Sequence, residues 1–231
     1  MPSSQKTLHF MSSGLMTAIS VGLMGFAMSR QWVETTMTCK RVGNENGTGN
    51  ATIKLDLFNG MLSRNLCPQF GGVDEFEVIP VLSEEGGIPV VLHILLLCLL
   101  SLCLLFSAIS ILLCLYNSVS NPYQTYMGPI GVYTCSSLSA CLSVVVLIIY
   151  VLNIYVTNMA EKLVVKFAES IPVELKDKSS AMKVGYYLII PYTVLSLAAI
   201  AFIYAYNNAA YKHKQEQQRP TEDAPKEIMM Y

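Results

Sequence analysis

The residues with the clearest chemistry are two asparagines, Asn46 and Asn50, which each begin an Asn-X-Thr triplet. This triplet is the acceptor pattern for N-linked glycans, which are attached only on the lumenal side of a membrane. Chance also produces such triplets in a chain of 231 residues, but two within seven residues favour glycosylation. We therefore predict that residues 30–87, which contain both asparagines, lie outside the cell.

Cys39 and Cys67 are the only two cysteines in that same stretch. An even count in an oxidising compartment favours a disulfide between them, and two free thiols are the alternative. Closing this loop would stabilise the fold by about 3–4 kcal/mol if the bond acts by restricting the unfolded chain. The other cysteines stand in apolar runs, where we interpret them as small packing residues: Cys98, Cys103, Cys114, Cys135 and Cys141.

Motifs for catalysis and metal binding are missing from the sequence, which has no HExxH, phosphate-binding loop, nucleophile elbow or CxxC pair. His93 lies inside a long apolar run without a carboxylate partner. We interpret it as an interfacial hydrogen-bonding group rather than a proton relay. The 15 basic and 16 acidic residues give a net charge of −1, which provides no nucleic-acid signature. We expect neither an enzyme nor a bound cofactor or metal.

Four long apolar runs must position these residues, at 8–29, 88–116, 129–156 and 184–210. A membrane-spanning helix needs about 20 mainly apolar residues, and its backbone groups must bond within the helix. The composition agrees, because 53% of the residues are hydrophobic and only 13% are charged. The alternative for the first run is a signal peptide that is cleaved near Ser29. We predict a membrane all-α fold, a left-handed bundle of four transmembrane helices.

The glycan acceptors set the orientation of this single predicted domain, residues 1–231, and place both termini in the cytoplasm. Residues 117–128 then form a cytoplasmic loop and residues 157–183 a second outer loop. Residues 211–231 are polar and contain two prolines, so we predict a disordered cytoplasmic tail. We expect an integral multi-pass protein that reaches the plasma membrane through the secretory pathway. Tyrosines near the ends of the runs, Tyr150 among them, are interpreted as anchors at the membrane interface.

The first outer loop shows the alternation that is typical of strands. Residues 53–57 alternate apolar and polar side chains, and residues 75–78 do likewise. Residues 32–34 are expected to start another strand. We predict a small extracellular antiparallel β-sheet that covers the bundle, with a polar turn at residues 44–50. In the second outer loop, residues 160–167 are expected to continue the third helix.

Small residues recur every four positions in three of the runs, and such faces let helices approach closely in lipid. Gly14, Ala18 and Gly22 form this face in the first run. Contact within one bundle and homodimerisation through the glycine face are both open readings. Pro191 is predicted to kink the fourth helix. The third and fourth runs carry similar faces: Ser136 with Ala140, Ser139 with Ser143, and Ala201 with Ala205 and Ala209.

The last and third-last residues of the tail, Tyr231 and Met229, have apolar side chains. A scaffold domain that captures a C-terminus by strand addition reads such a pattern. Many chains end this way by chance, so recognition of the tail is a hypothesis.

Several further motifs carry a resemblance to a known family. The chain resembles the clarin family, of the claudin-like four-span superfamily, over essentially its full length. Residues 121–133, together with motifs in the tail, make it most similar to the third paralogue of that family. Asp56 stands where the family usually has a glycine. The residues that carry the resemblance are Trp32, Cys39, Leu57-Phe58-Asn59-Gly60, Cys67, Tyr116-Asn117, Asn121-Pro122-Tyr123, Gly128-Pro129-Ile130-Gly131-Val132-Tyr133, Glu161-Lys162, Lys214-Gln215-Glu216-Gln217 and Ala224-Pro225.

This resemblance implies a claudin-like fold and a non-enzymatic membrane organiser. Other clarins are linked to mechanosensory hair cells, to their synapses and to actin-rich projections. The expected role is that of a scaffold or accessory subunit for other integral membrane proteins, with actin-linked proteins as further partners. The alternatives are a claudin-type barrier or pore at cell junctions, and a channel or transporter.

Overall fold

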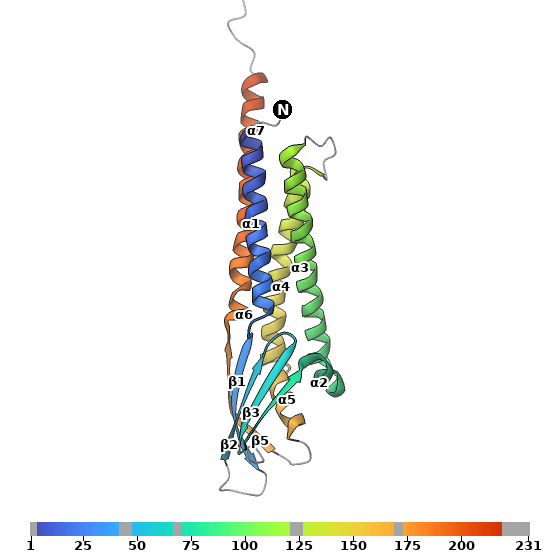
Figure 1. Ribbon diagram of the computed structural model, residues 1–231, viewed down its shortest axis with the longest axis vertical. Coiled ribbons are helices and arrows are strands. Elements are labelled where there is room, and N and C mark those ends of the chain that lie inside the picture. The colour runs from blue at the N-terminus through green and yellow to red at the C-terminus, as the bar shows by residue number, and fades with distance from the viewer. Residues whose placement is uncertain (1–3, 42–47, 67–70, 121–126, 169–172, 219–231) are drawn as a thin grey trace, which may run out of the picture.

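Four long helices run side by side and form an elongated bundle that carries a β-sheet at one end (Figure 1). The computed structural model describes residues 4–41, 48–66, 71–120, 127–168 and 173–218. Each of the four helices is long and apolar enough to cross a membrane, as the four runs predicted. The helices are α1 (Ser4–Met28), α3 (Ile88–Val119), α4 (Pro129–Tyr155) and α7 (Ile189–Gln218), with the short α6 (Val184–Tyr187) before α7.

The four helices follow one another around the bundle in the order α1, α3, α4 and α7, so that each packs on two neighbours. On α3, Leu96 and Leu100 face the interior, whereas Leu95 and Leu102 are exposed on the outside. Lipid tails are as apolar as leucine, so hydrophobicity does not distinguish these two faces. Small and polar side chains mark the interior instead, as described below.

The fourth helix is longer than the sequence predicted. Residues 211–218, which we expected to begin a disordered tail, continue α7 as far as Gln218. The expectation is wrong for this segment because it contains no glycine or proline and is rich in lysine, glutamine and glutamate, which favour helices. Pro220 stands two residues after Gln218, the last helical residue. A helix interior does not tolerate proline, so the sequence favours a helix end before this position.

The kink expected from Pro191 coincides with an interruption of the fourth helix. α6 ends at Tyr187 and α7 begins at Ile189, so Leu188 separates the two. A proline has no N–H group to donate to the carbonyl four residues earlier, and its ring clashes with that carbonyl. For Pro191 this carbonyl belongs to Tyr187, the last residue of α6.

The sheet has five antiparallel strands in the order β4-β3-β2-β1-β5. The alternating patterns predicted parts of β1, β2 and β4 and missed β3 and β5. These two strands carry mostly polar side chains, so no sustained apolar alternation marks them. The strands are β1 (Val33–Arg41), β2 (Thr48–Leu55), β3 (Asn59–Asn65), β4 (Gly72–Glu77) and β5 (Val173–Met182).

Two short helices lie beside the sheet, α2 (Val78–Glu85) and α5 (Met159–Phe167). We expected residues 160–167 to continue the third helix, which is wrong because Asn158 adopts a left-handed backbone with φ of 52° and separates α5 from α4. α5 buries Leu163 in one apolar cluster with Met37, Ile53 and Leu62 of the sheet. The cluster fastens one face of the sheet to the helix.

Trp32 joins the sheet to the bundle and is fully buried. Its indole N–H donates a hydrogen bond of 2.8 Å to the carbonyl oxygen of Ala27, in the last turn of α1. Its backbone N–H donates to Leu55 of β2 at 2.9 Å, and its carbonyl accepts from the N–H of Lys183 at 2.8 Å. One residue therefore connects α1, β2 and the start of α6.

Tyr150 of α4 completes this junction. Its ring lies edge-on to the indole of Trp32, with 4.9 Å between the ring centroids. Tyr150 is only 1% exposed, so our interpretation of it as an interface anchor is wrong. Tyr116, Tyr155 and Tyr187 are about half exposed, as an anchor requires.

We predict that Gly185→Ala weakens the junction. A Cβ at residue 185 would lie 2.5 Å from Cδ1 of Trp32 and 2.9 Å from the carbonyl oxygen of Arg30, which leaves no room for a methyl group. Overpacking of this kind costs about 1–3 kcal/mol of unfolding free energy. The measurement is the denaturation of the full-length protein in detergent.

Gly25→Ala is the matched control, because no atom lies within 4 Å of a Cβ at that position. It should leave the unfolding free energy nearly unchanged. Equal losses for the two variants would contradict the role assigned to the junction.

Candidate functional site

Asn50 lies on the solvent-exposed face of β2 and is itself exposed. Its cross-strand neighbours are Thr38 on β1 and Asn65 on β3. An acceptor asparagine must be reachable from solvent, so its position suits a glycan. Asn46 lies outside the described residues, and glycosylation at both positions stays a prediction.

Cys39 is buried in the sheet and is disulfide-bonded. Its expected partner, Cys67, lies outside the described residues, so the pairing remains a prediction. The five cysteines of the helices are free, as the packing interpretation requires. Cys103 and Cys114 are buried in the bundle, whereas Cys98 and Cys141 are exposed on its outside.

A group of charged side chains ties the sheet to the start of α6. Glu34 of β1 contacts the ammonium group of Lys183 at 2.6 Å and that of Lys54, on β2, at 4.0 Å. The hydrogen bond from Lys183, together with the positive charges, holds the pKa of the Glu34 carboxyl below its ordinary value, although partial burial opposes the shift. The ion pair between Glu34 and Lys183, called the clamp below, lies beside the Trp32 junction.

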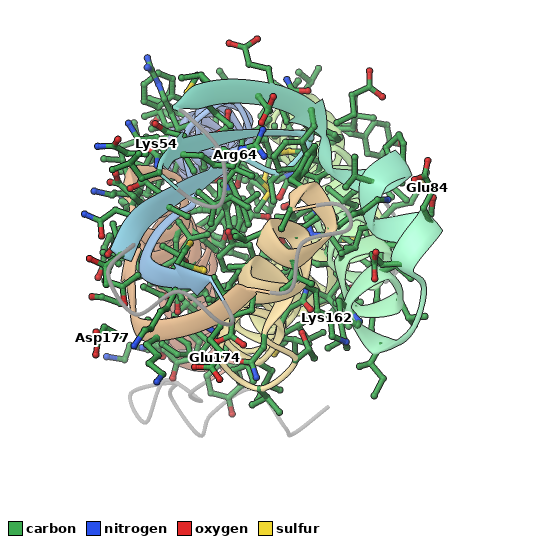
Figure 2. All side chains as sticks on the ribbon, turned by 90° about the horizontal axis from the view of Figure 1, so that it is seen from below. Lys54, Arg64, Glu84, Lys162, Glu174 and Asp177 are labelled. Carbon is green, nitrogen blue, oxygen red and sulfur yellow. The ribbon has the colours of Figure 1, made fainter. Side chains whose placement is uncertain are left out.

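A second charged group fixes the sheet to α5. Arg64 of β3 forms an ion pair with the carboxylate of Asp74 on β4. Its side chain is labelled in Figure 2. It also donates to the carbonyl oxygen of Phe167 at 2.9 Å, at the negative end of the α5 dipole.

Lys166 links α5 to α2 by a 2.6 Å contact with Glu84 and a 2.8 Å hydrogen bond to the carbonyl of Val81. Sheet, α2 and α5 are thus held as one cap.

Hydroxyl groups connect the helices inside the bundle. The hydroxyl of Tyr192 on α7 crosses the interior to Ser107 of α3, at 2.9 Å, and to Ser139 of α4. Ser143 of α4 bonds to Thr193 of α7 at 2.7 Å. In lipid such bonds contribute about 0.6 kcal/mol each on average, and they fix which faces of the helices meet.

The small-residue faces divide between the inside and the outside of the bundle. Gly14 is buried, and a Cβ there would lie 3.3 Å from Cβ of Cys114, but Ala18 and Gly22 are exposed. The small residues of α4 are buried, as expected if they serve contacts within the bundle. On α7 this expectation is wrong, because Ala201, Ala205 and Ala209 are exposed. On α1 each step of four residues turns by about 40° around the helix, so Ala18 and Gly22 lie away from the buried face that contains Gly14. Homodimerisation through the exposed part stays a prediction.

His93 is buried, and its Nε2–H donates to the carbonyl oxygen of Leu57 at 2.8 Å. It therefore acts as a hydrogen-bonding group, as predicted, and holds the turn between β2 and β3 against α3. Over the described part of the chain, no three His, Cys, Asp or Glu side chains come together as metal ligands. Met229 and Tyr231 of the tail lie outside the described residues.

Sequence reasoning missed the residues that fasten the sheet, above all Lys183, Gly185 and Arg64. These residues act over long sequence separations, and no local pattern marks them.

Comparisons with known proteins agree in pointing to one family. The family model described as Clarin-2, Clarin-2-like, matches residues 4–205. Clarin-3 of Mus musculus is 31% identical and Clarin-3 of Rattus norvegicus 32% identical, each over the full length of both chains. Clarin-1 of Mus musculus is 25% identical over 71% of this chain and 72% of its own.

The clamp between Glu34 and Lys183 predicts a stability that depends on pH. The pKa of Glu34 is lower in the folded protein than in the unfolded chain, so its ionised form stabilises the fold. This stabilisation is fully present when the pH is above the pKa of the unfolded chain. It is lost as the pH falls below about 5 and then through the pKa of the folded protein. Lys183→Met should therefore cost about 0.5–1 kcal/mol at neutral pH and much less at pH ~3. Denaturation of the full-length protein at the two pH values measures this difference.

Lys176→Met is the control, since its ion pair with Glu174 is more than half exposed on both sides. It should change the unfolding free energy very little at either pH. A loss of equal size at both pH values for Lys183→Met would show that the lysine stabilises by packing and not by charge.

Proposed function

Because this chain belongs to the clarin family, we propose that it is a non-enzymatic scaffold or accessory subunit that organises other integral membrane proteins. The observation that carries this proposal is the rigid attachment of the sheet. Trp32 fastens one end of it to the bundle, and Arg64 fastens another part to α5. A preformed surface binds without the cost of ordering a loop, which suits a recognition role.

The lipid-facing side of the bundle offers a second surface. Ala18 and Gly22 on α1, and Ala201 and Ala205 on α7, are small and exposed. Helices associate in lipid where small residues let their backbones come close. We assign these faces to contacts with the helices of partner proteins or of a second copy of the chain.

The proposed setting is the plasma membrane, at actin-rich projections, cell junctions or sensory-cell synapses. In this proposal the sheet lies outside and both termini lie in the cytoplasm. Met229 and Tyr231 are then available to a C-terminus-binding scaffold domain, which would join the protein to actin-linked partners.

Glycosidase treatment tests this orientation. Protein from intact cells should lose mass on digestion, and Asn50→Gln should remove part of that shift, because Asn50 is an exposed acceptor. Asn59→Gln is the control, since Asn59 is exposed but begins no acceptor triplet. A wild-type protein that shows no shift would remove the support for an outer sheet.

Proximity labelling in cells tests the scaffold role. The wild type should return a reproducible set of integral membrane proteins. Ala18→Leu together with Gly22→Leu should reduce part of that set severalfold, because the added side chains keep a second helix away. Val194→Leu, at a large residue that is 58% exposed on α7, is the control and should leave the set unchanged.

Labelling that returns no reproducible membrane partner would contradict the proposal. A change in transepithelial resistance on expression, with strands between contacting cells, would instead support a claudin-type barrier.

A further inference from the structure

A groove of about 720 Å³ lies where the sheet meets the end of α1. Five charged residues line it, namely Arg30, Lys54, Asp56, Glu75 and Glu77. The groove therefore combines two cationic and three anionic side chains.

The strand register places two of these charges, Lys54 and Glu75, on the same face of the sheet. Lys54 on β2 pairs with Met61 on β3, and Met61 pairs with Glu75 on β4. Neighbouring strands are about 4.8 Å apart, so Lys54 and Glu75 lie on one face of the sheet with their backbones separated by ~10 Å. Met61 fills the floor between them. Among the described residues Lys54 and Glu75 form no ion pair, so the space above Met61 is open to a molecule that carries both charges.

The charges of the groove are largely unpaired. In the parts of the chain that are described, Arg30, Asp56, Glu75 and Glu77 form no ion pair, and Lys54 reaches only Glu34, at 4.0 Å. Glu34 is itself engaged by the much closer Lys183. Burial raises the pKa of the Asp56 carboxyl, as happens when a carboxylate is desolvated without a cation beside it.

The groove lies at the edge of the membrane. α1 ends at Met28, and the guanidinium of Arg30 stacks over the ring of Phe26, 4.3 Å from its centroid. Phe26 is 46% exposed near the end of this helix, which is long and apolar enough to cross a membrane. A lipid headgroup beside α1 is therefore within reach of Arg30 and of the groove next to it.

We propose that this groove binds the zwitterionic headgroup of a phospholipid, with Arg30 and Lys54 at the phosphate and the carboxylates of Asp56, Glu75 and Glu77 at the ammonium group. The ligand supplies an opposite charge to each of the two sets of side chains. A solely anionic headgroup satisfies the two cations but leaves three carboxylates facing a negative group. The groove thus selects phosphatidylcholine over phosphatidylglycerol.

Native mass spectrometry of the full-length protein in detergent, with each lipid added in turn, tests this assignment. The wild type should retain one phosphatidylcholine more strongly than phosphatidylglycerol. Arg30→Gln with Lys54→Gln should lower retention of phosphatidylcholine about fivefold, as the loss of two partly exposed charge contacts implies. Glu75→Gln with Glu77→Gln should reverse the preference in favour of phosphatidylglycerol, a gain that a misfolded protein would not show.

The matched control is Glu174→Gln with Lys176→Gln, a charged pair on β5 whose Glu174 lies apart from Lys54 (Figure 2). It should retain the wild-type preference. Equal retention of the two lipids by the wild type, or an unchanged preference in the Glu75 and Glu77 variant, would overturn the proposal. Displacement of the lipid by soluble phosphocholine at equal concentration would also overturn it, since it would assign the groove to a free small molecule.

Discussion

The placement of the sheet on the bundle depends on the burial of Trp32. The last carbonyl groups of a helix have no partner within it, and the indole N–H meets this need for Ala27 of α1. The same residue completes the backbone pairing of β2 through Leu55 and receives the N–H of Lys183. The backbone of Gly185 and the edge-on ring of Tyr150 pack closely against the indole. The ion pair between Glu34 and Lys183 and the contacts of α5 further stabilise the placement of the sheet that the buried Trp32 defines.

Within the bundle, hydrogen bonds between hydroxyl groups, and not the burial of apolar area, determine which faces of the helices meet. The outward and inward leucines of α3 are chemically alike, so the helices gain little from hiding one face instead of another. Tyr192 is different, because its hydroxyl needs partners in a medium without water and finds them on Ser107 and Ser139. This bond crosses from α7 to two other helices and fixes their rotation. Gly14 permits the corresponding close contact of α1 with Cys114.

The elements that the sequence predicted well are those whose signal is local. Four apolar runs mark the helices, and the alternation at residues 53–57 marks a strand, because burial of one face imposes the period. β5 could not be predicted in this way, since its partner β1 lies more than a hundred residues earlier and its own side chains are largely polar. Tyr150 was misassigned for a related reason. An aromatic residue near a helix end suits both a membrane interface and a buried junction, and only the position of Trp32 decides between them.

The length of α7 has a structural consequence. Its 30 residues extend for about 45 Å, whereas the hydrocarbon layer is about 30 Å thick. Figure 1 shows its last turns projecting past the start of α1, at the end of the molecule away from the sheet. The part of α7 beyond the hydrocarbon layer is therefore a helical stalk of about 15 Å, on the side of the bilayer opposite the sheet.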